Sequence, residues 1–545
     1  MTPETRYAAC RDRRGTTRDP EDVNDMRNLT EKNKRLIYSK RMLLVTVAAA
    51  ALAIIFSLSG CGRKVDVSAV NVCGVPLGEL RIYTEMTGDN RTERTEKAGE
   101  LRSHVNALLT EAGGKELETA DSVSDGSPAL IFTENASYGY DDYVVRLGTG
   151  GQVLFEGGSK WALKMAFGAF LEAYVLNGKG IDTEAAAAAG IQTGEPLIDY
   201  KAPDRKTYIN DPSLLPLHWL GEWTPPAKML DYSAKVACLE CKDKRRVFTA
   251  SHRGDWHRYP ENSIEAIISV WAMGGDCVEI DVRFTKDKVP VILHDNTLSR
   301  TTDFADKAGK NGLPESDKIG DWTLEQLRQL RLKEGQGGEG ARVTPYLIPT
   351  LEECLVAAKG RFFYILDKQK LWRYAELPDI EEIQPLSKKR YLAPWMERAD
   401  NFESVLIAYG TIDETEEGTM DADEALEIQK FIYETYSRKM YFYLRGWTDR
   451  GTAGPYAKTL EKGSLTNSGV IVNGGFAGSD TETQKVIKKL VKSHPRTFFG
   501  GWTIDSGGND TEEVWDKMYD VGLRGMMLDD IMRLVKRAAK LDGYK

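Results

Sequence analysis

Residues 246–545 alternate short apolar runs with longer amphipathic stretches. The apolar runs lie at 247–250, 277–284, 290–293, 361–366, 404–408, 440–444, 469–472, 497–504 and 525–528. Strands that alternate with helices in this way predict a parallel sheet covered by helices. The length of the region suits a (β/α)8 TIM barrel with an insertion. The alternative is an open, doubly wound sheet, but no GxGxxG motif directly follows a predicted strand.

A smaller α/β pattern precedes the barrel region, at residues 66–198. Predicted strands lie at 81–83, 129–132, 143–147 and 153–156, the last two flanking glycines in the pattern of a β-hairpin, and a helix is predicted at 160–176. The pattern resembles the small α/β domain that precedes the catalytic barrel in several glycosidase families. We assign it no chemistry. Residues 199–245 contain five prolines and are predicted to be a linker that wraps onto the next domain.

An apolar run at 43–58 follows basic residues and is followed by small ones. These are the parts of a secretory signal. The ending Leu-Ser-Gly-Cys61 resembles the bacterial lipobox, which implies that Cys61 is lipidated and becomes the mature N-terminus. The alternative is an uncleaved single-span anchor, because the run nearly spans a bilayer. In both cases residues 1–61 are a signal or anchor segment, and the body is expected on the extracytoplasmic face of the cell membrane.

Composition and charge exclude several classes of protein. The chain is 41% hydrophobic and 28% charged, which excludes wholesale disorder and a collagen-like rod. The formal net charge is -9, while the first 61 residues are net positive, so the body is strongly acidic. An acidic body has no general attraction to phosphate backbones, and we therefore expect no nucleic acid partner.

Two carboxylates alternate with aliphatic residues in the run at 277–284. The two-residue period of a strand puts Val278, Ile280 and Val282 on one face and Glu279 and Asp281 on the other. In a barrel strand the aliphatic face meets the helices, so both acids point inward. Buried neighbouring carboxylates repel each other, and a divalent cation relieves the repulsion, with oxygen ligands favouring Mg2+ or Ca2+. The alternative is an exposed edge strand with solvated acids.

Two histidines bracket this acidic strand. His252 and His294 each follow a short apolar run, and catalytic groups of barrel enzymes gather at the carboxyl ends of strands. A histidine pair can act as general base and general acid near neutral pH. Arg253 follows His252 and suits bidentate contact with phosphate oxygens. A cation, an arginine and a histidine pair together favour phosphodiester cleavage.

These residues belong to a longer series of motifs. The series comprises HRG at 252–254, PENS at 260–263, EIDVRFTKD at 279–287, PVILHD at 290–295 and TLSRTT at 297–302. In this order and spacing the motifs resemble the glycerophosphodiester phosphodiesterase family. Further matches, IPTLEE at 348–353, GWTID at 501–505 and GLRGMMLD at 522–529, extend the resemblance to about 246–535. The resemblance implies a TIM barrel, a Ca2+ or Mg2+ cofactor, and hydrolysis of glycerophosphodiesters to an alcohol and glycerol phosphate.

The resemblance also implies residue roles. By position, His252 and His294 match the family's acid/base histidines, Arg253 matches its phosphate-binding arginine, and Glu279 and Asp281 match its metal ligands.

Some further positions depart from the family pattern or complete it. The family's third metal ligand lies in a glutamate-x-lysine motif, whereas here Asp367 directly precedes Lys368. Asp367 is the candidate third ligand and Lys368 the candidate phosphate contact. Trp502 matches a tryptophan of the pocket wall. Leu528 replaces the usual threonine before Asp529, and no role is assigned to Asp529.

Three functions remain open from the sequence. The first is hydrolysis of small glycerophosphodiesters at the cell surface, and the second is attack on another diester, such as a teichoic acid or a lysophospholipid. The third is a catalytically inactive barrel that serves as a binding module. Inactive relatives usually lose a histidine or a metal ligand, and this chain retains both histidines and both acids of the acidic strand. An active enzyme is therefore expected.

Overall fold

The structure is a computed structural model that describes residues 65–123, 127–181, 193–367, 392–409, 422–445, 468–473, 481–503 and 510–543. The predicted signal segment, Cys61 and Lys368 lie outside these residues. Within them, no helix is both long enough and apolar enough to cross a bilayer.

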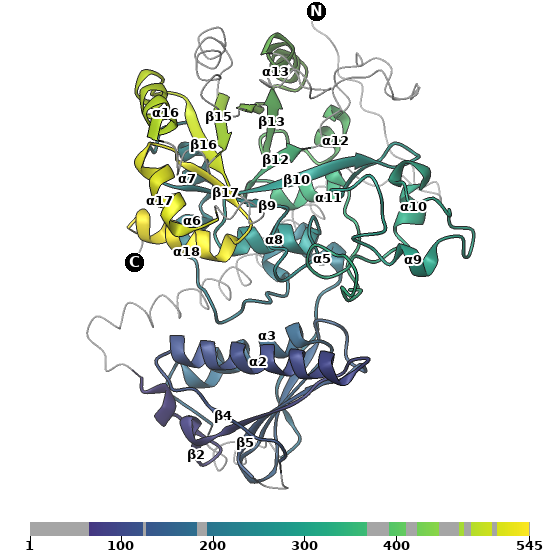
Figure 1. Cartoon of the computed structure of the whole chain (residues 1–545), viewed down its shortest axis with the longest axis vertical. Helices are drawn as coiled ribbons and strands as arrows, with labels where there is room; N and C mark the ends of the chain where they lie inside the picture. Colours follow the sequence, from purple (N-terminus) through teal and green to yellow (C-terminus); the bar gives the residue numbers. More distant parts are fainter. Residues whose placement is uncertain are drawn as a thin grey trace, which may run out of the picture.

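Eight parallel strands form a closed ring, and Figure 1 shows this region, from teal to yellow, with several of its strands labelled. The strands, in ring order, are β9 (Phe248–His252), β10 (Cys277–Phe284), β12 (Phe363–Asp367), β13 (Val405–Tyr409), β14 (Tyr441–Arg445), β15 (Ser468–Asn473), β16 (Phe498–Trp502) and β17 (Gly525–Leu528). β17 pairs back onto β9, and β9 pairs with β10. The predicted α/β barrel is confirmed, and the open doubly wound sheet is excluded by this closure.

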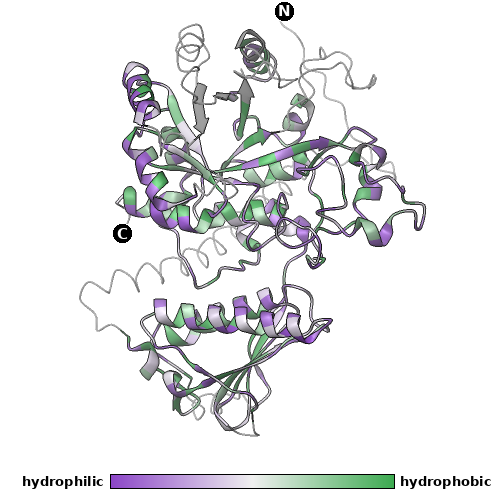
Figure 2. Ribbon diagram, in the orientation of Figure 1, coloured by the Kyte–Doolittle hydropathy of each residue, from purple (hydrophilic) through white to green (hydrophobic). Residues whose placement is uncertain are grey.

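Helices cover the outside of the ring. They are α8 (Ile264–Ala272), α11 (Leu351–Ala358), α12 (Ala393–Arg398), α13 (Ala422–Tyr436), α16 (Thr481–Ser493), α17 (Glu512–Asp520) and α18 (Ile531–Leu541). The aliphatic side chains of β10 pack with apolar residues of these helices in one large core. Figure 2 shows hydrophobic residues on the strands and inner helix faces, and hydrophilic residues on the outer faces. Ser263 is the N-cap residue of α8, since its side chain accepts a hydrogen bond from the Ala266 amide.

The segment between the two sheets is partly helical. It contains α5 (Arg205–Asn210), α6 (Ala227–Leu230) and α7 (Tyr232–Leu239). Cys238 and Leu239 of α7 join a second core, built from ring-interior aromatic residues such as Phe248, Phe363 and Tyr441. Phe248 and Phe363 lie near the amino ends of their strands. α7 therefore closes the amino end of the barrel, and the carboxyl end carries the polar strand termini.

The apolar run at 290–293 is not a strand of the parallel ring, and our expectation on this point was wrong. β11 (Pro290–Ile292) pairs antiparallel with β10, with Val282 opposite Ile292. Only a short turn, closed by a 3.1 Å hydrogen bond from Thr285 N to Val289 O, joins the two strands. A parallel neighbour needs a crossover of about a dozen residues or more, so this turn permits only an antiparallel hairpin.

An insertion follows β11. It contains α9 (Phe304–Lys307) and α10 (Leu324–Leu327) and ends in a hairpin at residues 332–346, which we call the glycine hairpin. The hairpin is closed by hydrogen bonds from Leu332 N to Tyr346 O (2.9 Å) and from Thr344 N to Leu332 O (2.8 Å).

A second sheet of six strands lies in the N-terminal part of the described chain. Its strand order is β4 (Glu118–Thr119), β3 (Arg81–Glu85), β5 (Ala129–Glu134), β7 (Val153–Gly157), β6 (Tyr143–Leu147) and β8 (Pro196–Tyr200), and a short pair, β1 (Asn71–Val72) and β2 (Val75–Pro76), precedes it. α2 (Arg91–Glu111) and α3 (Lys160–Phe170) bury one face of the sheet. In Figure 1 these helices lie between this sheet and the barrel. We call this unit the small domain.

Candidate active site

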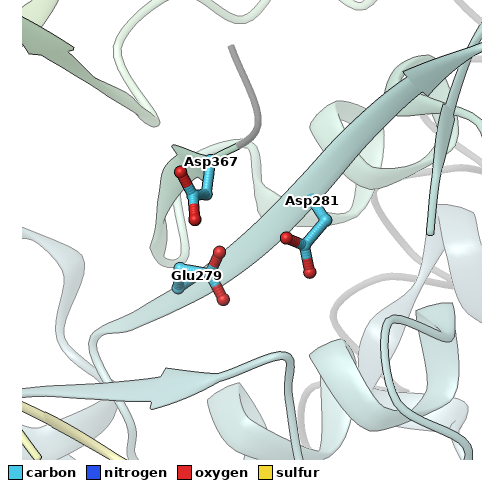
Figure 3. A group of neighbouring side chains, drawn as sticks. All are labelled: Glu279, Asp281 and Asp367. Atoms are coloured by element: carbon cyan, nitrogen blue, oxygen red, sulfur yellow. The ribbon is translucent and has the colours of Figure 1, made fainter. Parts of the chain in front are cut away.

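Three carboxylates meet at the carboxyl end of β12, where its parallel pairing with β10 ends. Glu279 and Asp281 are 4% and 1% exposed, and Asp281 is the register partner of Asp367 on β12. One oxygen from each of the three acids lies within 4.8 Å of the others. Figure 3 shows the three side chains turned toward one another from the two neighbouring strands. The strand alternation explains this arrangement, because Val278 and Ile280 occupy the helix-facing core while both acids of β10 face the opposite way.

The donor set fits a hard divalent cation. All three groups are carboxylates, which are the ligands that Ca2+ and Mg2+ prefer, and no thiol or imidazole belongs to the cluster. Placing two buried acids and one half-buried acid this close is costly unless positive charge is nearby. Arg253 supplies part of that charge, with Nε 3.5 Å from Asp281 Oδ2. Asn262 adds a 2.8 Å hydrogen bond from Nδ2 to the same oxygen.

The loop after β9 is held in an uncommon backbone conformation at two positions. Arg253 and Asn262 have φ values of 61° and 58°, in the left-handed region that non-glycine residues seldom adopt. The amide of Arg253 donates to Glu279 O (3.0 Å), and the amide of Asn262 donates to Arg253 O (2.9 Å). Strained residues of this kind persist where surrounding contacts hold them, and they cluster at functional sites. Here they turn both side chains toward the acids.

His252 ends β9 beside the acidic cluster. Its Nε2 lies 4.0 Å from Glu279 Oε2, and its Nδ1 lies 2.8 Å from Asp529 Oδ1. An ionised carboxylate only accepts hydrogen bonds, so Nδ1 carries the proton and Nε2 is the ring nitrogen that can take one. Trp256 also donates to Asp529, at 3.4 Å. Asp529 therefore fixes the ring orientation and tautomer of His252.

No role was predicted for Asp529, although the sequence carried a usable signal. Asp529 directly follows β17, so it occupies the same strand-end position that His252 and Asp367 occupy on their strands. Because β17 is the neighbour of β9 in the closed ring, the two strand ends meet.

The backbone before His294 returns to the strand that carries the acids. His294 follows β11, which runs antiparallel to β10 and brings the chain back to the level of Asp281. There the Leu293 amide donates a 2.9 Å hydrogen bond to the Asp281 carbonyl. Arg283 of β10 holds the carbonyl of His294 through Nε, at 3.1 Å, and through Nη2. His294 Nδ1 lies 2.6 Å from Asp295 Oδ1, so this histidine also has a carboxylate on Nδ1.

A network of charges supports Asp295 and Arg253. Arg300 donates from Nε to Asp295 (2.6 Å) and from Nη2 to Glu261 (2.6 Å), and Glu261 also accepts from Arg253 Nη1 (3.1 Å). Burial acts to raise the pKa of Asp295, but hydrogen bonds from Arg300 and His294 outweigh it and lower that pKa to about 2. Asp295 therefore stays ionised, and remains an acceptor for His294, throughout the neutral range.

The remaining candidate residues are placed as follows. Trp502 is half-buried at the carboxyl end of β16, where it borders the interior core of the ring. Lys368 lies outside the described residues, so its predicted phosphate contact stays a prediction. Asn262 and Ser263 have separate tasks, since Ser263 caps α8 while Asn262 binds Asp281.

The fold and the site define a class of protein, the (β/α)8 barrels with a charged centre at the carboxyl ends of their strands. Residues 252–399 match the sequence model of the glycerophosphoryl diester phosphodiesterase family. Over 89 residues the chain is 42% identical to glycerophosphodiester phosphodiesterase 1 of Rattus norvegicus, covering 16% of this chain and 24% of that protein. Over 141 residues it is 36% identical to a glycerophosphodiester phosphodiesterase of Caldanaerobacter subterraneus subsp. tengcongensis, covering 25% and 50%. The chain thus spans about a quarter to a half of these curated relatives.

Among solved structures, a glycerophosphoryl diester phosphodiesterase from Parabacteroides distasonis aligns with 58% of this chain and 93% of its own, at 22% identity and a TM-score of 0.39. The barrel region of this chain is thus similar in sequence to the glycerophosphodiester phosphodiesterase family over residues 252–399.

Replacing Asp529 with asparagine is expected to lower kcat by about 10²-fold or more, with a smaller change in KM. An asparagine can rotate its amide to donate to Nδ1, which favours the wrong tautomer of His252, and such a change costs up to about 10⁴-fold in a serine protease triad. Steady-state kinetics of Asp529→Asn provide the measurement. Asp530→Asn is the matched control, because Asp530 caps α18 through the Arg533 amide and asparagine caps equally well. Equal kcat values for the two variants would contradict the role of Asp529.

Proposed function

We propose that this chain is a divalent-cation-dependent hydrolase that cleaves glycerophosphodiesters into an alcohol and glycerol phosphate. The observation that carries the proposal is the meeting, at one end of the barrel, of a three-carboxylate cluster with two histidines that each have an aspartate on Nδ1. The match of residues 252–399 to the glycerophosphoryl diester phosphodiesterase family model supports the same chemistry.

Each part of the site has a task in that reaction. Glu279, Asp281 and Asp367 would hold the cation, which when bound supplies positive charge against the phosphate oxygens. The Arg253 side chain, held beside Asp281 and Glu261, offers its guanidinium to the same phosphate. One histidine takes the proton of the attacking water, and the other gives a proton to the leaving alkoxide.

A release assay on the purified chain tests this function. Glycerophosphocholine, glycerophosphoethanolamine, a glycerol phosphate oligomer and a lysophospholipid are each incubated with enzyme, and the phosphomonoester product is measured, which is glycerol phosphate for the first three and acyl-glycerol phosphate for the lysophospholipid. We expect release from the small diesters, lost when His252 is replaced by alanine, which excludes a contaminating enzyme. Release only from the oligomer or the lysophospholipid would move the function to that substrate. No release from any of the four by the folded protein would favour a binding module.

We further propose that the enzyme works on the extracytoplasmic face of the cell membrane, held there by residues 1–61. The support is the sequence pattern around the run at 43–58 and the lipobox-like ending at Cys61. Mass spectrometry of the mature N-terminal peptide distinguishes the two forms of attachment. An acylated peptide that begins at Cys61 supports the lipoprotein, an intact 1–60 segment supports a single-span anchor, and a soluble protein lacking both would refute membrane attachment.

A further inference from the structure

The tip of the glycine hairpin has little rigidity of its own. Four glycines with positive φ lie in it, namely Gly335 (61°), Gly337 (74°), Gly338 (99°) and Gly340 (78°). Glycine backbones have access to many conformations, so ordering such a segment costs more conformational entropy than ordering other residues. The ordered form of the tip therefore depends on contacts made from outside the hairpin.

The inner side of the tip holds two residues of the charged network. Gly335 O accepts a 2.8 Å hydrogen bond from the Glu261 amide, Gln336 O accepts one from Arg300 Nη1, and Gly338 N donates to Arg300 O at 2.7 Å. The packing is close, since a Cβ on Gly337 would lie 2.3 Å from Arg300 O.

Glu261 and Arg300 pass this support on to the reacting groups. Glu261 binds Arg253, the candidate phosphate ligand, at 3.1 Å. Arg300 binds Asp295, which in turn holds His294. The position of the hairpin tip thus affects both the phosphate contact and one of the two histidines.

The outer side of the hairpin is held by the small domain. Tyr140 donates a 2.7 Å hydrogen bond to Glu334 Oε1, and Arg342 Nη1 donates to Glu134 Oε1 at 2.8 Å. The Arg342 guanidinium also lies 5.4 Å from the centre of the Tyr140 ring. Glu134 is 4% exposed, and the Tyr140 ring packs against the barrel core.

A third contact strengthens this attachment. Tyr346, at the base of the hairpin, donates to Asp141 Oδ2 at 2.7 Å. Glu134, Tyr140 and Asp141 all come from the end of β5 and the loop that leads to β6. A single segment of the small domain therefore contacts the hairpin at residues 334, 342 and 346.

We propose that the small domain is a positioning element of the active site. Tyr140 and Glu134 hold the glycine hairpin in the conformation in which its carbonyls fix Glu261 and Arg300. Loss of these contacts releases the tip, and Arg253 and His294 then lose their alignment with the substrate. The proposal rests on the proposed hydrolase function for its effect on turnover, but its effect on the hairpin is independent of that function. A shift of about 1 Å in a catalytic group can cost about 10²-fold in rate.

The test compares the double variant Tyr140→Phe/Arg342→Gln with Glu111→Gln. Glu111 of α2 pairs with Lys536 of α18 at 3.7 Å, so the control also removes a contact between the small domain and the barrel, but one remote from the hairpin. Amide hydrogen exchange is measured in the peptides that contain Glu261 and Gly338. We expect faster exchange in both peptides of the double variant and none of this change in the control.

Kinetics provide the second measurement. The double variant is expected to lose roughly tenfold or more in kcat with a smaller change in KM, while the control keeps wild-type kcat. When the double variant is combined with Arg300→Lys, the activation free energy should rise by less than the sum of the two separate increases, because both changes act through the same contacts. Glu334→Ala, which removes the acceptor of Tyr140 from a half-buried side chain, should reproduce the effect if the double variant folds poorly.

The outcomes separate the two proposals. If the wild type hydrolyses no diester, the proposed function fails, and amide exchange alone still decides whether the small domain holds the hairpin. If the wild type is active but exchange or kcat of the double variant matches that of Glu111→Gln, the positioning role is overturned.

Discussion

Replacing Glu279 with glutamine is expected to lower kcat by at least about 10²–10³-fold, the loss typical when one electrostatic contact to a developing charge is removed. Glu279 is 4% exposed and is one of three acids whose oxygens lie within 4.8 Å of one another. Glutamine keeps the shape of the side chain but removes its charge, so the cluster binds a cation less tightly. The protein without cation should fold as well as wild type, because the substitution also removes a repulsion between buried carboxylates.

Two measurements check this result. A bound cation stabilises the folded state in proportion to the logarithm of its concentration over Kd, so Ca2+ or Mg2+ should raise the Tm of wild type more than that of Glu279→Gln. Asp367→Asn should show the same smaller rise, whereas Glu325→Gln, which changes an exposed acid on α10, should behave as wild type. Full activity of wild type after thorough chelation would contradict cation dependence, and unchanged cation affinity in Asp367→Asn would remove Asp367 from the site.

Substituting either histidine by alanine is expected to lower kcat by about 10²–10⁴-fold, the usual contribution of a general acid or base. His252 ends β9 and is held by Asp529, whereas His294 follows β11 and is held by Asp295, so the two rings have separate supports. KM should change less than kcat, because proton transfer contributes to the transition state more than to substrate binding. A loss of less than tenfold for both variants would rule out the acid/base assignment.

The leaving group identifies which histidine is the acid. p-Nitrophenolate leaves without a proton, so a p-nitrophenyl diester should recover much of the rate lost by the variant that lacks the acid. The variant that lacks the base should stay slow with both substrates. His294→Ala and His252→Ala are therefore expected to differ with this substrate, and equal recovery by both would contradict a division of labour between them.

The acidic cluster was predictable because it depends on local geometry. The two-residue period of a strand puts Glu279 and Asp281 on the same face wherever that strand lies, and the aliphatic residues between them mark the buried side. Asp367 was predictable for a related reason, since it ends the apolar run of the next parallel strand, and parallel strands end at the same edge of a barrel.

The direction of β11 was also available from the sequence but was missed. The apolar run at 290–293 has the same composition as a short barrel strand, so hydrophobic pattern alone does not separate the two. The spacing between the runs distinguishes the two cases, because too few residues separate Phe284 from Pro290 for a crossover helix. The consequence is functional, since the antiparallel return is what carries His294 back beside Asp281.

By itself, the sequence determined the alternation of strands and helices, the face of β10 that carries the acids, and the residue types of the centre. These features follow from periodicities that operate within a few residues. Only the tertiary structure decided that Asp529 orients His252, across 277 positions of the chain, and that Tyr140 of the small domain reaches Glu334, across 194. Such pairs arise from closure of the ring and from docking of one domain on another, and neither produces a periodic pattern of residues in the sequence.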